Sequence, residues 1–73
     1  MKITVNMIDQ NGESVKGIIQ VGEQAVQTSN GYAVFDDLTE GNYVVRGLAR
    51  GYCLESKIVH LVDEDLFVVI EAR

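Results

Sequence analysis

Proline and tryptophan are both absent from this 73-residue sequence, and cysteine and histidine occur once each. The single cysteine, Cys53, excludes a disulfide within the chain. A zinc site built from nitrogen and sulfur takes about four ligands, and Cys53 and His60 are the only two candidates in the chain. A catalytic nucleophile also needs a base and an orienting group beside it. We therefore expect no metal, no cofactor and no enzymatic activity, with Cys53 as a small apolar filler and His60 as an ordinary strand residue.

Cations are scarce. The chain has six lysines and arginines and eleven acidic residues, which gives a formal charge of −5. A negative chain repels phosphate backbones and anionic membrane surfaces, so nucleic acid is not an expected partner. No apolar run approaches the ~18 residues of a membrane span, and no basic segment followed by an apolar one begins the sequence. We expect neither membrane insertion nor an export signal in this chain.

The length predicts a single domain covering residues 1–73. A chain this short buries only about 60% of its unfolded surface, which leaves a small core and little room for a deep active-site cleft.

Apolar and polar residues alternate from the first residue onward. The apolar members are Met1, Ile3, Val5 and Met7, with Lys2, Thr4 and Asn6 between them. A period of two indicates a strand whose first set faces the core and whose second set faces water. We expect this strand to lie at a sheet edge that is open to a partner strand.

Further short runs of strand character follow, and glycine and asparagine separate them. The predicted strands cover residues 15–21, 25–28, 32–35, 43–50, 54–62 and 66–71. Asn11-Gly12, Gly22-Glu23 and Asn30-Gly31 are predicted as hairpin turns. No stretch has the period of an amphipathic helix, and a single open sheet would leave one apolar face uncovered. The sequence therefore predicts an all-β sandwich or small barrel.

One spacing of turn and core residues is typical of a known family. It comprises Thr28, Asn30-Gly31-Tyr32, Phe35, Leu38, Gly41 and Tyr43, then Gly51-Tyr52, preceded by DQNGESVKG at 9–17. This spacing resembles the carboxypeptidase regulatory-like domains. The resemblance implies an Ig-like or transthyretin-like β-sandwich of about seven antiparallel strands. It also implies core positions for Phe35, Leu38 and Tyr43, a non-catalytic role, and a place on a cell surface or virion.

The related collagen-adhesin B-type repeats carry an internal isopeptide bond formed by a lysine, an asparagine and a catalytic acid. In this chain Gly47 follows Arg46 where those repeats place an acid, and residues 66–71 contain no asparagine. Lys2 is predicted to face solvent. We therefore expect no internal cross-link.

Two acidic clusters, Asp36-Asp37 with Glu40 and Asp63-Glu64-Asp65, are expected to be solvated turns. Neither has the spacing of a calcium loop.

The stretch 43–50 supplies the candidate contact surface. If Tyr43, Val45, Gly47 and Ala49 face the core, the outward residues are Val44, Arg46, Leu48 and Arg50, with Tyr52 at the rim. Arginine beside apolar residues is typical of protein interfaces, although a mixed surface strand is the plainer interpretation. We predict a structural or protein-interaction module that is a monomer or weak dimer in isolation and binds an acidic protein partner. A carbohydrate-binding module is the alternative, for which Tyr32, Tyr52 and Phe67 are the candidate rings.

Overall fold

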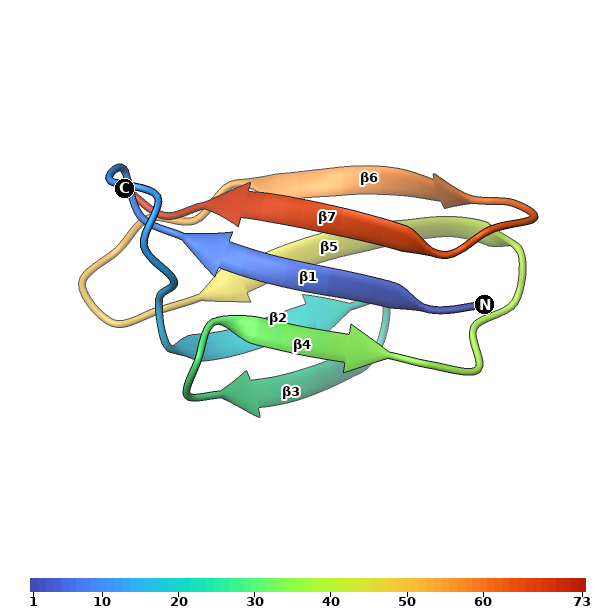
Figure 1. Ribbon diagram of the computed structural model, residues 1–73, viewed down its shortest axis with the longest axis horizontal. Coiled ribbons are helices and arrows are strands. Elements are labelled where there is room, and N and C mark those ends of the chain that lie inside the picture. The colour runs from blue at the N-terminus through green and yellow to red at the C-terminus, as the bar shows by residue number, and fades with distance from the viewer.

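The chain folds into seven strands and no helix, as a computed structural model of residues 1–73 describes (Figure 1). The strands are β1 (Ile3–Ile8), β2 (Gly17–Val21), β3 (Gln24–Thr28), β4 (Tyr32–Phe35), β5 (Gly41–Leu48), β6 (Ser56–Leu61) and β7 (Leu66–Glu71). One sheet has the order β4-β1-β7 and the other the order β3-β2-β5-β6. The two sheets pack face to face, which confirms the predicted all-β sandwich. No helix is long and apolar enough to cross a membrane.

The core lies between the sheets and draws on every strand except β3. Each of these strands contributes alternate residues to the core, because every second side chain points toward the facing sheet. Phe35 and Leu38 are buried as predicted. Tyr43 is half-buried and packs against the core, while its hydroxyl donates a hydrogen bond to the Thr39 carbonyl at 2.7 Å. The ring therefore serves as an anchor with its polar end in water.

At two of the predicted hairpin turns the flanking strands do not pair with each other in one sheet. Asn11-Gly12 joins β1 to β2 and Asn30-Gly31 joins β3 to β4, and in both cases the two strands belong to different sheets. The tight Asn-Gly hairpin turn needs a positive φ at both residues. Here only the glycines have one, 82° at Gly12 and 79° at Gly31. At Asn11-Gly12 the chain still reverses, because Ile8 and Ser14 form an antiparallel bridge and the Val15 N–H donates to the Met7 carbonyl at 2.9 Å. It enters the other sheet only after this bridge, whereas at Asn30-Gly31 it crosses directly between the layers.

The Gly22-Glu23 prediction is confirmed, because Val21 pairs with Gln24 on either side of this two-residue turn. The loop after β1 is held by a side chain, since the Asp9 carboxylate accepts hydrogen bonds from the backbone N–H groups of Asn11 and Glu13. An aspartate that accepts hydrogen bonds from the backbone of its own loop stabilises a tight turn.

The expectation that the first strand is a sheet edge is also wrong. β1 is the central strand of its sheet and lies antiparallel to β4 and parallel to β7. The β1 and β7 pair is therefore an exception to the antiparallel arrangement expected for the whole sandwich.

The side-chain pattern of β1 differs from the prediction at two residues. Asn6 is buried, and its Nδ2 is satisfied there by donating to Ser14 Oγ and to the Gly31 carbonyl. Met1 is partly exposed, although it was predicted to face the core. Lys2 is exposed as predicted.

β7 lies at an edge of its sheet, but residues 53–57 cover the part of that edge from Val69 to Arg73. Cys53 and Arg73 exchange two backbone hydrogen bonds of 2.7 and 2.9 Å, and Leu54 forms a bridge with Ala72. Lys57 Nζ on β6 donates to the Val69 carbonyl at 2.6 Å. A covered edge does not offer the free backbone groups that strand addition requires.

Candidate interaction surfaces

The predicted contact residues of β5 lie on the outer face of the four-stranded sheet. Val45 on the same strand is buried in the core, while Val44 and Arg46 point to solvent. Leu48 is 67% exposed. The alternation predicted for this strand is therefore confirmed, whereas the role of these residues in binding stays a prediction.

Neighbouring strands extend this surface through cross-strand pairs. Ile18 of β2 pairs with Leu48, and Ile58 of β6 pairs with Val44. Ile58 is 77% exposed. We call the set the four-stranded face, and its members are Ile18, Val44, Arg46, Leu48 and Ile58. Sequence reasoning missed Ile18 and Ile58. The alternation within 15–21 could have found Ile18, because it places this side chain on the outer face of the strand when Ile19 faces the core.

Gly47 allows this face to lie close to the opposite sheet. A Cβ at residue 47 would come within 2.8 Å of Met7 Sδ on β1 and 2.9 Å of Ile70 Cδ1 on β7. A glycine fits here without strain, whereas a Cβ would require the ends of these two core side chains to shift.

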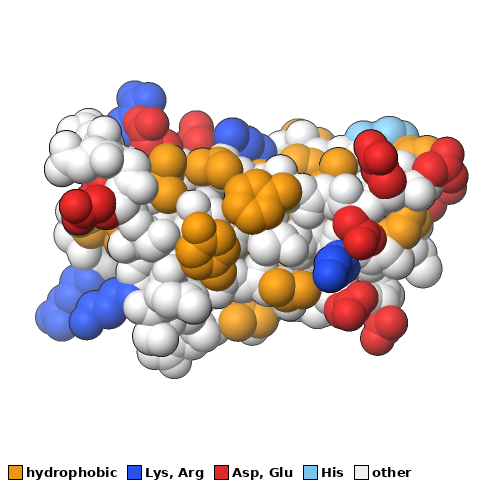
Figure 2. Space-filling view, in the orientation of Figure 1, with side chains coloured by type: hydrophobic (Ala, Val, Ile, Leu, Met, Phe, Trp, Pro, Cys, Tyr) orange, Lys and Arg blue, Asp and Glu red, His pale blue; other side chains and the backbone are white.

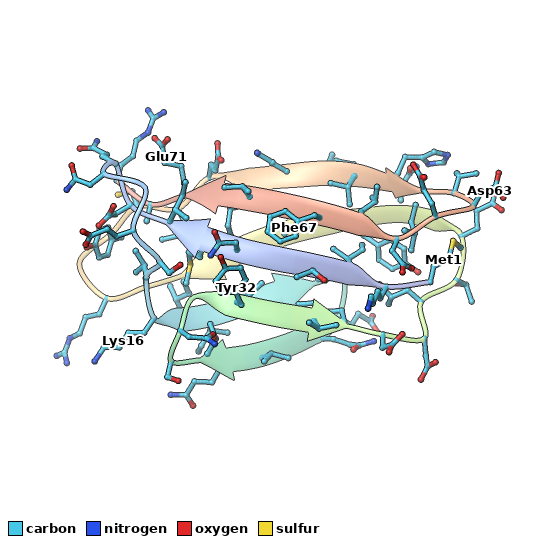
Figure 3. All side chains as sticks on the ribbon, viewed as in Figure 1. Met1, Lys16, Tyr32, Asp63, Phe67 and Glu71 are labelled. Atoms are coloured by element: carbon cyan, nitrogen blue, oxygen red, sulfur yellow. The ribbon has the colours of Figure 1, made fainter.

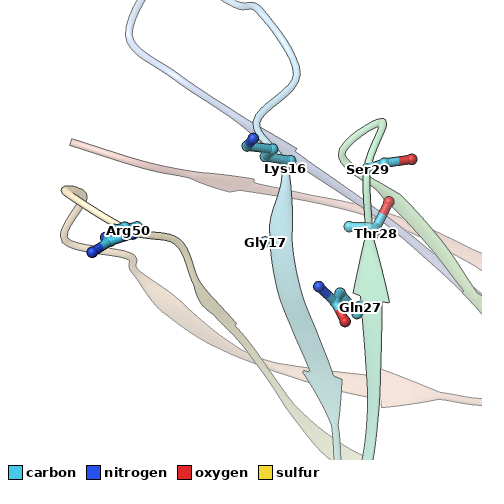
Figure 4. A pocket seen from close by; sticks show the side chains of 6 residues that line it. All are labelled: Lys16, Gly17, Gln27, Thr28, Ser29 and Arg50. Atoms are coloured by element: carbon cyan, nitrogen blue, oxygen red, sulfur yellow. The ribbon is translucent and has the colours of Figure 1, made fainter.

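The structure separates Arg50 and Tyr52 from the four-stranded face. Both follow the end of β5, in the connection to β6, so the five predicted contact residues do not form one strip. Arg50 lines a shallow groove together with Lys16, Thr28 and Ser29 (Figure 4). Tyr52 lies in an adjoining depression.

The groove is a basic spot on an acidic chain. The ion pairs of the chain join Lys57 to Glu55 and Arg73 to Glu71, and neither Lys16 nor Arg50 forms one. The adjoining depression is lined by the same two cations together with Asp9 and Glu13. We call the first region the basic groove and define it by Lys16 and Arg50.

A second apolar surface lies on the outer face of the three-stranded sheet. The rings of Tyr32 on β4 and Phe67 on β7 have centroids 6.5 Å apart and are tilted by 53° (Figure 3). Tyr32 is 46% exposed and Phe67 61%, and Val34 is exposed on the same face. Figure 2 shows orange side chains gathered on the middle of this face. We call Tyr32, Val34 and Phe67 the aromatic face.

Cys53 and His60 are not brought together. Cys53 pairs with Arg73 beyond the end of β7, whereas His60 Nδ1 contacts Asn42 Oδ1 at the opposite end of β6. His60 is exposed, as expected of a surface strand residue. The expectation for Cys53 is wrong, because its side chain is exposed instead of filling the core. Cys53 contributes to the fold through its backbone, which forms hydrogen bonds with Arg73.

The acidic clusters are exposed turns, as predicted, and two of their carboxylates make local hydrogen bonds. Asp36 Oδ1 accepts from the Asp37 N–H at 2.9 Å, and Asp65 Oδ1 accepts from the Lys2 N–H at 2.8 Å. No group of three or more histidine, cysteine, aspartate or glutamate side chains is arranged to hold a metal ion.

Sheet order, core and turns together define a small β-sandwich. No protein-family model matches the chain, and no curated protein matches it by sequence. Among solved structures, the chain is similar to the TIE protein of Bacillus anthracis, with a TM-score of 0.79 and 20% sequence identity. The match covers 97% of this chain and 16% of that one, so the chain spans a small part of the protein it resembles. A likeness at this identity supports the sandwich fold and nothing finer.

Proposed function

We propose that this chain is a non-catalytic protein-interaction module of a surface, virion or accessory assembly, and that it belongs with the carboxypeptidase regulatory-like, transthyretin-like domains. The main support is the four-stranded face, where Leu48 and Ile58 are 67% and 77% exposed around Arg46. Aliphatic side chains this exposed stabilise the folded chain little and gain by being covered by a partner. Arginine is enriched at interfaces because its long stem packs and its guanidinium pairs.

The partner we propose is a protein with acidic side chains at its contact. Arg46 lies within the four-stranded face, and the basic groove lies beyond the end of the same strand. Neither Lys16 nor Arg50 forms an ion pair within the chain, although Asp9 and Glu13 line the adjoining depression with them. Both cations can therefore pair with an acidic group of a partner. Complementary charge at a rim mainly raises the association rate, while the aliphatic centre contributes most of the affinity.

Capture experiments with three paired variants test this proposal. The face variant combines Arg46→Glu with Leu48→Ser, and the groove variant combines Lys16→Glu with Arg50→Glu. The opposite-face control combines Tyr32→Ser with Phe67→Ser. Each immobilised chain is exposed to extract of the native host at low salt, and the retained proteins are identified by mass spectrometry.

We expect one set of proteins to be retained by the unmodified chain and the control, and to be lost with the face variant. The groove variant should bind more slowly but retain the same proteins, because a rim charge acts mainly on the association rate. Circular dichroism first confirms that each variant is folded. Equal retention of these proteins by the face variant and the unmodified chain contradicts the proposed surface. If only the opposite-face control loses them, the binding site lies on the aromatic face.

A carbohydrate-binding module is the second candidate, and the Tyr32 and Phe67 ring pair is the observation that favours it. Sugar faces stack on exposed rings. The 53° tilt gives no flat platform, however, and neither ring lines any of the surface depressions. A glycan array separates the two candidates: binding that Tyr32→Ala removes would favour the carbohydrate function.

A further inference from the structure

The two ends of the chain lie at opposite ends of the molecule. The fold measures 34 × 18 × 17 Å, and Figure 1 shows the N-terminus near one end of the long axis and the C-terminus near the other. β1 and β7, the strands nearest these ends, run in the same direction along that axis. A pull that separates the ends therefore drags β1 and β7 past each other along their length.

β1 and β7 are also direct neighbours. They pair in parallel from Ile3 opposite Leu66 to Ile8 opposite Glu71. The pairing continues at both ends, where the Leu66 N–H donates to the Lys2 carbonyl at 3.0 Å and the Ala72 N–H donates to the Ile8 carbonyl at 2.7 Å. The hydrogen bonds of a parallel ladder are evenly spaced along both strands. A lengthwise pull therefore loads all of them together, whereas a pull that opens one end loads them one after another.

Side chains add to this resistance. Val5 and Met7 of β1 and Val68 and Ile70 of β7 are buried between the sheets. Sliding either strand forces these side chains past neighbours in a densely packed core. β1 also pairs with β4 on its other side, so it is gripped along both edges.

We propose that β1 and β7 form a mechanical clamp that lets this domain carry tension between its two ends. The outermost contacts give way first: the Met1 and Leu38 hydrogen bonds at one end, and the Cys53 and Arg73 pair at the other. The clamp then holds until the ladder breaks as a unit. This function goes beyond the proposed interaction function and does not depend on any partner.

Single-molecule force spectroscopy tests the clamp by changing only the direction of the pull. Cys53→Ser removes the exposed native thiol, and handles are attached through introduced cysteines. In the lengthwise geometry the cysteines precede Met1 and follow Arg73. In the opening geometry the second cysteine is Glu64→Cys, in the turn before β7, so that both handles lie at the same end of the β1 and β7 pair.

We expect a rupture force several-fold higher in the lengthwise geometry at equal pulling speed, with the whole domain unfolding in one step. The fold is the same in both geometries, so a difference in force reports the barrier along each direction of pulling. Equal forces in the two geometries would overturn the clamp. Stepwise release of β7 ahead of the main rupture would overturn it as well.

A pair of point variants locates the resistance within the ladder. Asp65→Ala removes the carboxylate that accepts the Lys2 N–H at the start of the clamp, and Glu64→Ala is its control from the same exposed turn. We expect the first to lower the lengthwise rupture force and the second to leave it unchanged. No difference between them, in chains whose circular dichroism matches the unmodified chain, would contradict a clamp that begins at Lys2.

Discussion

Tyr32 and Phe67 lean toward each other across β1, whereas Leu48 and Ile58 on the other sheet extend away from the protein. Two strands separated by a third lie roughly 10 Å apart, yet the two ring centroids are 6.5 Å apart. The rings therefore converge over the central strand, where Thr4 is half-buried and Asn6 buried. The aromatic face covers its own sheet. The four-stranded face leaves its largest aliphatics 67% and 77% exposed.

This difference shows that exposed apolar area alone does not identify a binding surface. Rings that shield a central strand have a structural role that requires no partner, and their exposure follows from their size. Leu48 and Ile58 cover little of their own sheet, because Ile58 belongs to the edge strand β6 and Leu48 ends β5. The four-stranded face is therefore the stronger candidate for a contact, even though it contains no aromatic residue.

The largest expected effect on stability is at β4, where Phe35 is assigned to the core side and Tyr32 to the solvent side. Phe35→Ala should cost about 3–5 kcal/mol of unfolding free energy, since it empties a buried ring site, and a domain this small could then fail to fold. Tyr32→Ala should cost much less, because its ring is 46% exposed. Chemical denaturation measures both. Equal losses would show that the two sides of β4 are assigned wrongly.

The next largest loss of stability is expected where a methyl group is added at a glycine that other atoms closely approach. Gly47→Ala and Gly17→Ala should each cost about 1–3 kcal/mol, the usual range for overpacking. At Gly47 the added methyl meets the flexible ends of Met7 and Ile70, whereas at Gly17 it meets the backbone carbonyl of Leu48. Backbone moves less readily than a side-chain end, so Gly17→Ala should be the more damaging. Thermal melts that rank the two in the reverse order would contradict this account.

A smaller effect measures how far the aromatic face stabilises its own sheet. A double-mutant cycle with Tyr32→Ala and Phe67→Ala should give a coupling of about 0.5–1.5 kcal/mol, which is typical of aromatic pairs. The same cycle on Leu48 and Ile58 is the control and should give almost none, because those residues do not pair directly. If the two couplings are equal, the distinction between the two faces fails.

The strands could be predicted from sequence because alternation and turn residues are local signals. The strand pairing could not. The Asn11-Gly12 and Asn30-Gly31 dipeptides have hairpin composition, but whether the following strand pairs with the preceding one or joins the other sheet depends on contacts far along the sequence. β1 pairs with β7 across more than sixty residues, and nothing near β1 indicates this partner.

The candidate site was predictable to the same extent. Val44, Arg46 and Leu48 share a strand, so alternation alone places them on one face. Ile18 and Ile58 join them only through the register of β2 and β6 with β5. Arg50 and Tyr52 lie apart because β5 ends at Leu48, and the exact end of a strand is poorly encoded by local sequence.

The smallest expected effect on stability is on the four-stranded face itself. Leu48→Ser combined with Ile58→Ser should change the unfolding free energy by no more than about 0.5 kcal/mol for each substitution, since neither side chain is buried. Sedimentation should show the unmodified chain as a monomer that dimerises only weakly at high concentration, and the double variant should lose that dimer. Phe67→Ser is the control and should retain it, because the ring packs against its own sheet. A dimer that survives the double variant but disappears with Phe67→Ser would show that the aromatic face forms the dimer interface. The aromatic face, and not the four-stranded face, would then be the stronger candidate for a contact.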